Sequence, residues 1–482
     1  MTDTAPKPGL VLLVVSTAAF LASLDTFIVT IAFPGIRAAF PGDDLATLSW
    51  VLNGYTVLFA ACLAPAGRLA DRYGRKRLFL IGVAVFTLAS AACAIAPSIP
   101  VLIGFRAVQA IGAALVMPTS LALLLTAFPP HRRPMAVGVW ASVGAAAAAL
   151  GPPVGGLLVE ASWRWVFLVN LPICALTLLA GPRVLRESRD TGTGVPDLLG
   201  AAGLLVGVGA LAYALVEAPD HGWGSPAVVA AFVVAVVALA WVPLRSARHA
   251  VPVLDLPALR VPTLWLACVT TGVFAAGFAA MLFGNVLFLT SIWHDSVLLA
   301  GLSLAPGPLM VVPVSILGGR FVHRFGPGPI VALGGVSFGL GVLIWLLRMD
   351  STRDYASAML PGQLLTGIGV GLILPSLSGV VGTVLPAARW GAGSSMVNTT
   401  RQIGTVLGTA VLVAIFAGTP DLTDFRHGWL LILATAVATS AGGLLIAARR
   451  RTDHHVELET HETQARSSAA SPSSMRSTGI AP

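Results

Sequence analysis

Charged side chains are scarce in this sequence. Asp, Glu, Lys and Arg make up 10% of its 482 residues, and Lys7 and Lys76 are the only lysines. Because soluble domains carry about 25% charged residues, most of this chain is expected to contact lipid rather than water. Hydrophobic residues reach 56%, and the mean hydropathy is +0.86. The composition therefore predicts an integral membrane protein.

Other absences exclude whole classes of function. No Gly-x4-Gly-Lys-Ser/Thr loop is present, which argues against ATP as the energy source. Paired carboxylates and nucleophile–base sets are missing as well, so we predict a protein that is not an enzyme and needs no cofactor or metal. The cysteines lie in apolar stretches, without the spacing of a metal site or a disulfide framework: Cys62, Cys93, Cys174 and Cys268.

Long apolar stretches are abundant instead. About twenty apolar residues suffice for a helix to cross a hydrocarbon core of about 30 Å, and such a helix pairs its own backbone groups. We count fourteen stretches of this kind: 10–33, 47–66, 78–96, 99–127, 135–159, 165–182, 198–217, 225–244, 263–290, 297–319, 328–347, 357–384, 392–416 and 427–448. The fold is therefore predicted to be all-α, with fourteen transmembrane helices.

Basic residues are distributed unevenly among the connecting loops. Twenty Lys and Arg residues fall on the side of the N-terminus, and five fall on the opposite side. Since cytoplasmic loops are enriched in these residues, both termini are predicted to lie in the cytoplasm, with the spans in the cytoplasmic membrane. The net charge of +8 then reflects topology and contact with anionic lipid, not nucleic-acid binding. The excess of Arg over Lys is typical of a GC-rich coding sequence, which favours a bacterial source.

The two halves of the chain are alike. A shift of 257 residues places Gly112 on Gly369 and Gly151 on Gly408. Repeats in the same orientation predict two similar bundles, related by an axis along the membrane normal. The predicted division is a cytoplasmic N-terminus (1–9), a six-helix bundle (10–182), an inserted helix pair (198–244), a second six-helix bundle (263–448) and a disordered cytoplasmic tail (449–482).

Asp25 is a lone carboxylate in the first span. An ionised Asp at mid-bilayer costs about 2.5–3.5 kcal/mol, so burial favours its protonated form. A carboxyl group that binds and releases a proton near neutral pH is what proton-coupled transport requires. Arg106 in the fourth span is expected at a similar depth, about 20 Å from the inner surface against about 22 Å for Asp25.

We therefore predict that Asp25 and Arg106 face one central cavity as a proton-coupling pair. Arg106 would stabilise the ionised carboxylate when near, and allow protonation when the bundles move apart. The alternatives are a purely structural hydrogen-bonded Asp25 and an Arg106 paired permanently with backbone carbonyl groups.

The loop Gly67-Arg68-Leu69-Ala70-Asp71-Arg72-Tyr73-Gly74-Arg75-Lys76-Arg77 resembles the signature loop of the major facilitator superfamily. Its glycines permit a tight turn and close helix approach. Asp71 is suited to bond a helix N-terminus of the opposite half, and the arginines are suited to pair across the cytoplasmic seam. The predicted gate residues are Gly67, Asp71, Arg72, Gly74 and Arg75. A basic turn that only sets topology is the alternative.

Three further stretches are similar to those of the fourteen-span drug:proton antiporters of that superfamily: Leu24–Pro34, Arg106–Gly112 and Gly151-Pro152-Pro153-Val154-Gly155-Gly156. The chain departs from the family pattern at Thr30, Phe33 and Ala110. Importers usually lack the last stretch, in which Gly151, Pro152, Gly155 and Gly156 are the antiporter-motif residues. The resemblance implies the major facilitator fold, with two six-helix bundles and two inserted helices, and it implies export.

Isolated polar residues in the spans are candidates for the wall of a substrate cavity: Asn53, Tyr55, Gln109, Asn285, Gln363, Asn398 and Arg401. Interhelical hydrogen bonds explain such residues as well. The resemblance implies a monomeric, proton-driven exporter of amphiphilic small molecules that confers drug or antibiotic resistance. Export of an endogenous metabolite or siderophore by the same mechanism is the alternative, and a proton-coupled importer is less favoured.

Overall fold

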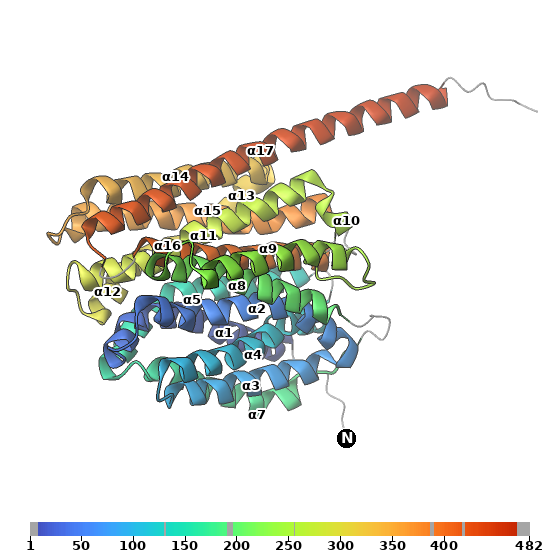
Figure 1. The fold of residues 1–482 in the computed structure, drawn as a ribbon. Helices are drawn as coiled ribbons and strands as arrows, with labels where there is room; N and C mark the ends of the chain where they lie inside the picture. The colour runs from blue at the N-terminus through green and yellow to red at the C-terminus, as the bar shows by residue number, and fades with distance from the viewer. Residues whose placement is uncertain are drawn as a thin grey trace, which may run out of the picture.

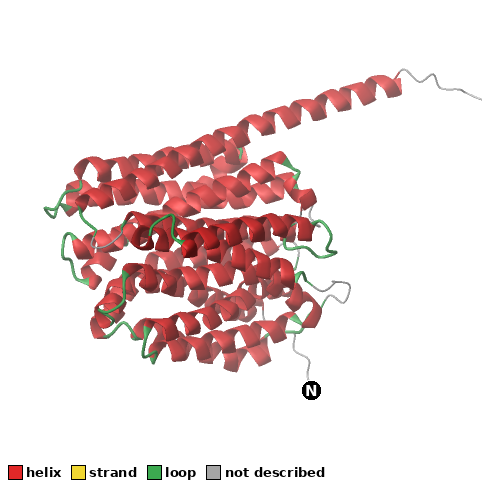
Figure 2. Cartoon of the chain, in the orientation of Figure 1, coloured by secondary structure: helices red, strands yellow, loops and turns green. Residues whose placement is uncertain are grey.

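The computed structural model describes residues 8–129, 132–189, 196–254, 256–385, 390–416 and 420–469, and these residues form helices and loops without a strand (Figure 2). The helices are α1 (Pro8–Ala39), α2 (Leu45–Tyr73), α3 (Arg75–Ala94), α4 (Ile99–Ala127), α5 (Arg133–Ala161), α6 (Trp165–Leu168), α7 (Asn170–Val184), α8 (Leu198–His221), α9 (Pro226–Ser246), α10 (Leu256–Leu259), α11 (Pro262–Ser291), α12 (Val297–Leu304), α13 (Pro306–Phe325), α14 (Pro327–Arg348), the π-helical turn η2 (Tyr355–Met359), α15 (Leu360–Val384), α16 (Trp390–Ile415) and α17 (Leu422–Ala469).

Twelve helical segments of the described residues are long and apolar enough to cross a membrane. They coincide with twelve of the fourteen predicted spans. The other two predicted spans, 135–159 and 392–416, are also helical and fall within α5 and α16. The prediction of an all-helical, multi-pass membrane protein is thus confirmed, whereas the count of fourteen spans stays a prediction.

Two of the predicted spans contain short breaks. Span 165–182 consists of α6 and α7, and span 297–319 consists of α12 and α13. Proline has no N–H group to donate to the carbonyl four residues earlier, and Pro172 and Pro308 stand where such donors are needed to continue α6 and α12. The break before α7 makes Asn170 its first residue.

The helices gather into two bundles, with α1–α4 and α7 below and α11–α17 above in Figure 1. The same glycine contact recurs in both. A Cβ atom at Gly112 would lie 2.6 Å from the backbone N of Phe86, joining α4 to α3. A Cβ atom at Gly369 would lie 2.8 Å from the backbone N of Phe338, joining α15 to α14 in the same way. The sequence repeat is therefore also a repeat of helix packing.

The inserted pair lies in front of the two bundles in Figure 1. Its first helix, α8, packs against α9, against α2 of the N-terminal bundle and against α16 of the C-terminal bundle. Trp50 of α2 and Tyr213 of α8 bring their ring centroids within 6.5 Å. Most of α9 remains accessible on its outer face, as expected for a helix that contacts lipid.

The last helix differs from the expectation of disorder from residue 449. α17 continues to Ala469 and projects beyond the bundle (Figure 1). Once a helix is nucleated, each further residue adds one hydrogen bond without a new nucleation cost, so α17 can extend past the membrane-spanning part. The rest of the predicted tail (470–482) and the first seven residues of the predicted N-terminal segment lie outside the described residues.

Candidate functional site

The predicted pair meets inside the N-terminal bundle. Arg106 of α4 donates from Nη1 to Asp25 Oδ2 of α1 at 2.5 Å. Both side chains are enclosed, with exposed fractions of 0% for Asp25 and 1% for Arg106. The sequence prediction that these two residues lie together is correct, but in this structure they are surrounded by helices instead of facing an open central cavity.

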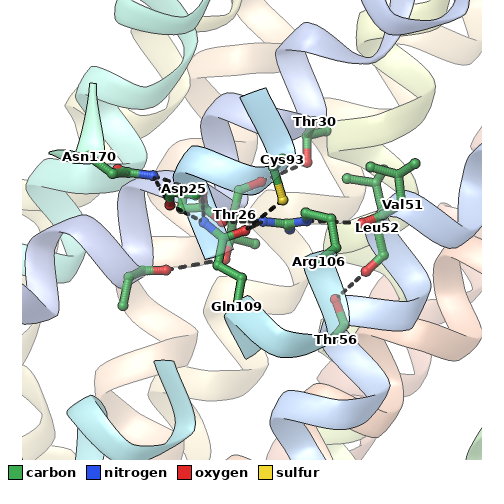
Figure 3. Close-up of polar contacts among 12 residues, drawn as sticks. Asp25, Thr26, Thr30, Val51, Leu52, Thr56, Cys93, Arg106, Gln109 and Asn170 are labelled. Carbon is green, nitrogen blue, oxygen red and sulfur yellow. Dashed lines mark hydrogen bonds and ion pairs between the residues drawn. The ribbon is translucent and has the colours of Figure 1, made fainter. Parts of the chain in front are cut away.

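Two amide side chains complete the surroundings of the carboxylate (Figure 3). Gln109 donates from Nε2 to Asp25 Oδ1 at 2.9 Å, and Asn170 donates from Nδ2 to the same oxygen at 3.1 Å. Both amides also donate to Ser90 Oγ of α3, at 2.7 and 3.2 Å. We call Asp25, Ser90, Arg106, Gln109 and Asn170 the buried polar cluster. It draws on α1, α3, α4 and α7.

The partners of Arg106 explain how a cation is held here. Besides Asp25, the guanidinium donates to Gln109 Oε1 at 2.6 Å and to the carbonyl oxygen of Val51 at 3.2 Å. Its Cζ lies 4.0 Å from the centroid of the Tyr55 ring, a distance suited to cation–π attraction. A buried charge without partners is strongly unfavourable, and Arg106 keeps three partners apart from the carboxylate.

Sequence reasoning missed Ser90 and Asn170 and assigned Tyr55 and Gln109 to a substrate cavity. The structure places Tyr55 and Gln109 around Arg106 instead. The available signal was an isolated polar residue in the third and in the sixth apolar stretch. Such a residue does not reveal its partners, because the rotation of each helix about its axis is unknown.

The predicted gate loop is bound to its own half. Asp71 accepts from Arg75 at 2.8 Å, one turn further along. The backbone N–H groups of Lys76 and Arg77 donate to the carboxylate of Glu187, each at 3.1 Å. The predicted bond from Asp71 to the opposite half does not occur among the described contacts. The anion at the N-terminus of α3 is instead Glu187, a residue that sequence reasoning missed.

The glycines of this loop have the predicted steric roles. Gly74 has φ of +116°, and a Cβ atom there would lie 2.7 Å from the carboxyl carbon of Glu187. A Cβ atom at Gly67 would lie 3.4 Å from Pro118 of α4. Arg72 lies over the ring of Tyr73, with Cζ 5.6 Å from the centroid.

The glycines of α5 pack against two partners. Cβ atoms at Gly151 and Gly155 would meet Phe27 and Ile31 of α1, at 2.5 and 3.3 Å. On another side of α5, a Cβ atom at Gly156 would lie 2.8 Å from Leu298 Cα. The carbonyl group of Pro152 lies directly against Gly301 of α12. The α5 stretch therefore forms part of the seam between the two halves.

A second contact between the halves lies at the same end of the molecule. Phe33 of α1 meets Phe283 of α11 edge to face, with centroids 4.8 Å apart. Beyond this pair, the ends of α1 and α11 border a cavity of about 410 Å³. It is lined by Pro34, Arg37, Ala38, Pro41, Asp43, Leu287, Thr290 and Ser291.

The other cavity candidates are dispersed. Asn53 and Asn285 are buried, and neither the Nδ2 of Asn53 nor the amide atoms of Asn285 have a described partner. Gln363 is buried against Gly307 of α13. Arg401 of α16 donates to Asn398 Oδ1 at 3.1 Å, and its Nε has no described partner. These residues do not form one contact network within the described part of the chain.

Comparisons with known proteins agree with this architecture. The model of the Major Facilitator Superfamily matches residues 15–409 and 269–479. A solved structure of a D-xylose–proton symporter is similar with a TM-score of 0.65, at 13% identity, over 90% of this chain and 97% of that one. At this identity the likeness concerns the fold.

Curated relatives are more similar in sequence. The multidrug resistance protein Stp of Mycobacterium tuberculosis is 36% identical over 87% of this chain and 78% of that protein. The methylenomycin A resistance protein of Streptomyces coelicolor is 34% identical over 90% of this chain and 91% of that protein. The tetracenomycin C resistance and export protein of Streptomyces glaucescens is 32% identical, over 85% and 76%.

Proposed function

The chain belongs to the Major Facilitator Superfamily, and on that premise we propose that it exports amphiphilic small molecules, antibiotics among them, in exchange for protons. The cargo class is supported by the relatives, whose names describe resistance to several drugs, to methylenomycin A and to tetracenomycin C. These names favour drug efflux over the export of an endogenous metabolite or siderophore.

The observation that carries the coupling proposal is the enclosed carboxylate of Asp25. Three donors from two other helices stabilise its ionised form, and exclusion from water opposes that form. A carboxyl group held between such opposing effects is suited to change its protonation when the surroundings shift. In this proposal Asp25 takes up a proton from outside and releases it inside as cargo leaves.

Arg106 is suited to stay in place while Asp25 binds and releases its proton. When Asp25 is neutral, the guanidinium still has Val51 O, Gln109 Oε1 and the Tyr55 ring. Its donors therefore keep neutral partners, which lowers the cost of a buried cation beside a neutral Asp25. Proton uptake by Asp25 then weakens one contact of Arg106 and leaves its position in α4 supported.

Conformational change is assigned to the seam and the loop between α2 and α3. The α5–α12 contact and the Phe33–Phe283 pair hold one end of the molecule closed in this structure. In this proposal the signature loop (Gly67, Asp71, Arg72, Gly74 and Arg75) engages the opposite half in the alternate state. Asn53, Asn285, Gln363, Asn398 and Arg401 remain candidates for contacts with cargo.

The finer topology also belongs to this proposal. Fourteen spans, cytoplasmic termini and a location in the bacterial cytoplasmic membrane follow from the apolar stretches and the excess of basic residues on one side. The transporter is proposed to function as a monomer. An importer role is less favoured, because the α5 stretch resembles that of exporters.

The test is drug:proton exchange in everted membrane vesicles. An imposed gradient, acid inside, drives drug uptake by the wild type, and drug addition collapses the gradient. Asp25→Asn is expected to abolish both signals. Asp44→Asn is the matched control, because Asp44 caps α2 outside the cluster by accepting from Thr47 N at 2.7 Å and Asn caps equally well.

Retained uphill transport by Asp25→Asn would contradict the coupling proposal. Cargo is identified separately, from the resistance profile of expressing cells against diverse antibiotics. Accumulation of one endogenous compound in cells without the protein, with no change in drug resistance, would support metabolite export instead.

A further inference from the structure

Asn170 lies beside the Asp25 carboxylate, and the nitrogen of its side-chain amide is hydrogen-bonded whereas the oxygen has no described partner. Its Nδ2 donates to Asp25 Oδ1 at 3.1 Å and to Ser90 Oγ at 3.2 Å. Its Oδ1 is buried and has no partner among the described residues. The residue itself has an exposed fraction of 0%. A buried amide oxygen without a hydrogen bond is costly, so its presence beside a titratable group calls for a physical reason.

The ionised and the protonated states of Asp25 have different needs. The carboxylate only accepts hydrogen bonds, and all three of its described side-chain partners donate. A protonated Asp25 carries an O–H group that must itself find an acceptor. The described arrangement therefore suits the ionised state and lacks an acceptor for the proton.

Among the three partners, Asn170 can supply that acceptor without setting an N–H group against the guanidinium. Arg106 has donors only. Gln109 already uses its Oε1 to accept from Arg106 at 2.6 Å, and turning its amide would set N–H groups against the guanidinium. Turning the Asn170 amide gives up the two bonds of Nδ2, but it brings Oδ1, which has no described bond, to the same two partners. Ser90 can adapt, since a hydroxyl group both donates and accepts.

We propose that Asn170 is the positioning residue for the proton on Asp25, through a half-turn of its amide; this rests on the proposed proton coupling. A hydronium ion gives its proton to a lone pair of Asp25 Oδ1 and leaves as water, and no electron is transferred. Asn170 Oδ1 then accepts from the new O–H group and from the Ser90 hydroxyl. Loss of the proton returns the amide to the described orientation.

Few other titratable groups of the described residues lie near Asp25. Those that interact with it electrostatically are Arg106 of α4, Tyr55 of α2, Cys93 of α3 and Cys174 of α7. Arg106 is the cation of this set, and it stays a donor in both states. The tyrosine and the thiols are neutral at ordinary pH, so the protonation of the cluster is set mainly by Asp25.

The functional test compares Asn170→Leu with Thr177→Val on the same helix. Thr177 is buried, but the bond described for its hydroxyl goes to Ile173 O in its own helix. With Leu at position 170, the carboxylate keeps Arg106 and Gln109, whereas the protonated form loses its acceptor. The pH of half-maximal exchange is expected to fall by about one unit, a tenfold loss of proton affinity, with exchange recovered in more acidic medium. Thr177→Val is expected to match the wild type.

An unchanged midpoint in folded Asn170→Leu overturns the inference. So does a midpoint shifted to higher pH, because Asn170 would then act only as a donor to the carboxylate. Loss of exchange in Asp25→Asn together with either result leaves the proposed function standing, so the two failures can be distinguished.

A second measurement needs no variant at position 170. The chain has four asparagines, Asn53, Asn170, Asn285 and Asn398, so ¹³C in the asparagine side-chain carbonyl gives few infrared bands. Acidification is expected to shift one of them to lower wavenumber as the protonated carboxyl band appears, in the wild type but not in Asp25→Asn. A carboxyl band without the asparagine shift overturns the inference. Absence of the carboxyl band overturns the proton coupling as well.

Discussion

At the scale of single residues, the buried polar cluster shows how one charge determines its neighbours. A carboxylate without access to water needs donors, and α3, α4 and α7 supply or orient them through Ser90, Arg106, Gln109 and Asn170. The cation in turn needs acceptors and finds Val51 O and Gln109 Oε1. Each member of the cluster therefore makes at least one hydrogen bond to another member.

Arg106→Lys tests whether the shape of the guanidinium matters or only its charge. Lysine keeps the charge but cannot contact Asp25, Gln109 and Val51 at once while lying flat on the Tyr55 ring. Exchange is expected to slow about tenfold or more, a change of about 1.4 kcal/mol, measured as the rate of drug-induced proton movement. Arg183→Lys is the control, because Arg183 is exposed and its described bond goes to Leu179 O. Equal exchange rates for Arg106→Lys and Arg183→Lys would mean that only the positive charge of Arg106 matters, and not the shape of its guanidinium group.

At the scale of elements, α5 explains how the halves approach each other. Gly151 and Gly155 bring α5 against α1 of its own half, and Gly156 brings it against α12 of the other. Small side chains allow such backbone approach in a membrane, where helix association depends on packing rather than on water exclusion. One side of α5 thus packs against α1 in its own half, and another side packs against α12 in the other half.

Gly156→Ala is expected to force α5 and α12 apart. The added Cβ would lie 2.8 Å from Leu298 Cα and 3.0 Å from Val297 O, and overpacking of this kind costs about 1–3 kcal/mol. Both the thermal midpoint of the purified protein and the transport rate are expected to fall. Gly104→Ala in α4 is the matched control, because nothing lies within 4 Å of its added Cβ. If Gly156→Ala were as stable and active as Gly104→Ala, the close α5–α12 contact would not be required for stability or transport.

At the scale of the whole molecule, the repeat and the inserted pair have different structural consequences. The repeat places like glycine contacts in α3–α4 and α14–α15. The inserted helix α8 instead touches one helix of each half, α2 and α16. The protein is thus two similar bundles with a further helix pair, of which α8 contacts both bundles.

Reporter fusions test the predicted path through the membrane. A periplasmic-type phosphatase fused after Trp223, between α8 and α9, is expected to be active because that loop lies outside. Fusions after Arg248 and at the C-terminus are expected to be inactive, because one and seven further spans, both odd numbers, return the chain to the cytoplasm. An inactive fusion after Trp223 would exclude the inserted pair as two spans and reduce the count below fourteen.

The membrane class, the helical segments, the repeat and the Asp25–Arg106 pair were accessible from sequence, because hydropathy, spacing and the cost of a charge in lipid are properties of the chain itself. The sequence did not reveal Asn170 and Ser90 as partners of Asp25, or Glu187 as the anion at the start of α3. Their roles depend on how helices rotate about their axes and which backbones touch. Tertiary packing alone decides those rotations, and so it alone decided that this carboxylate is enclosed and which groups donate to it.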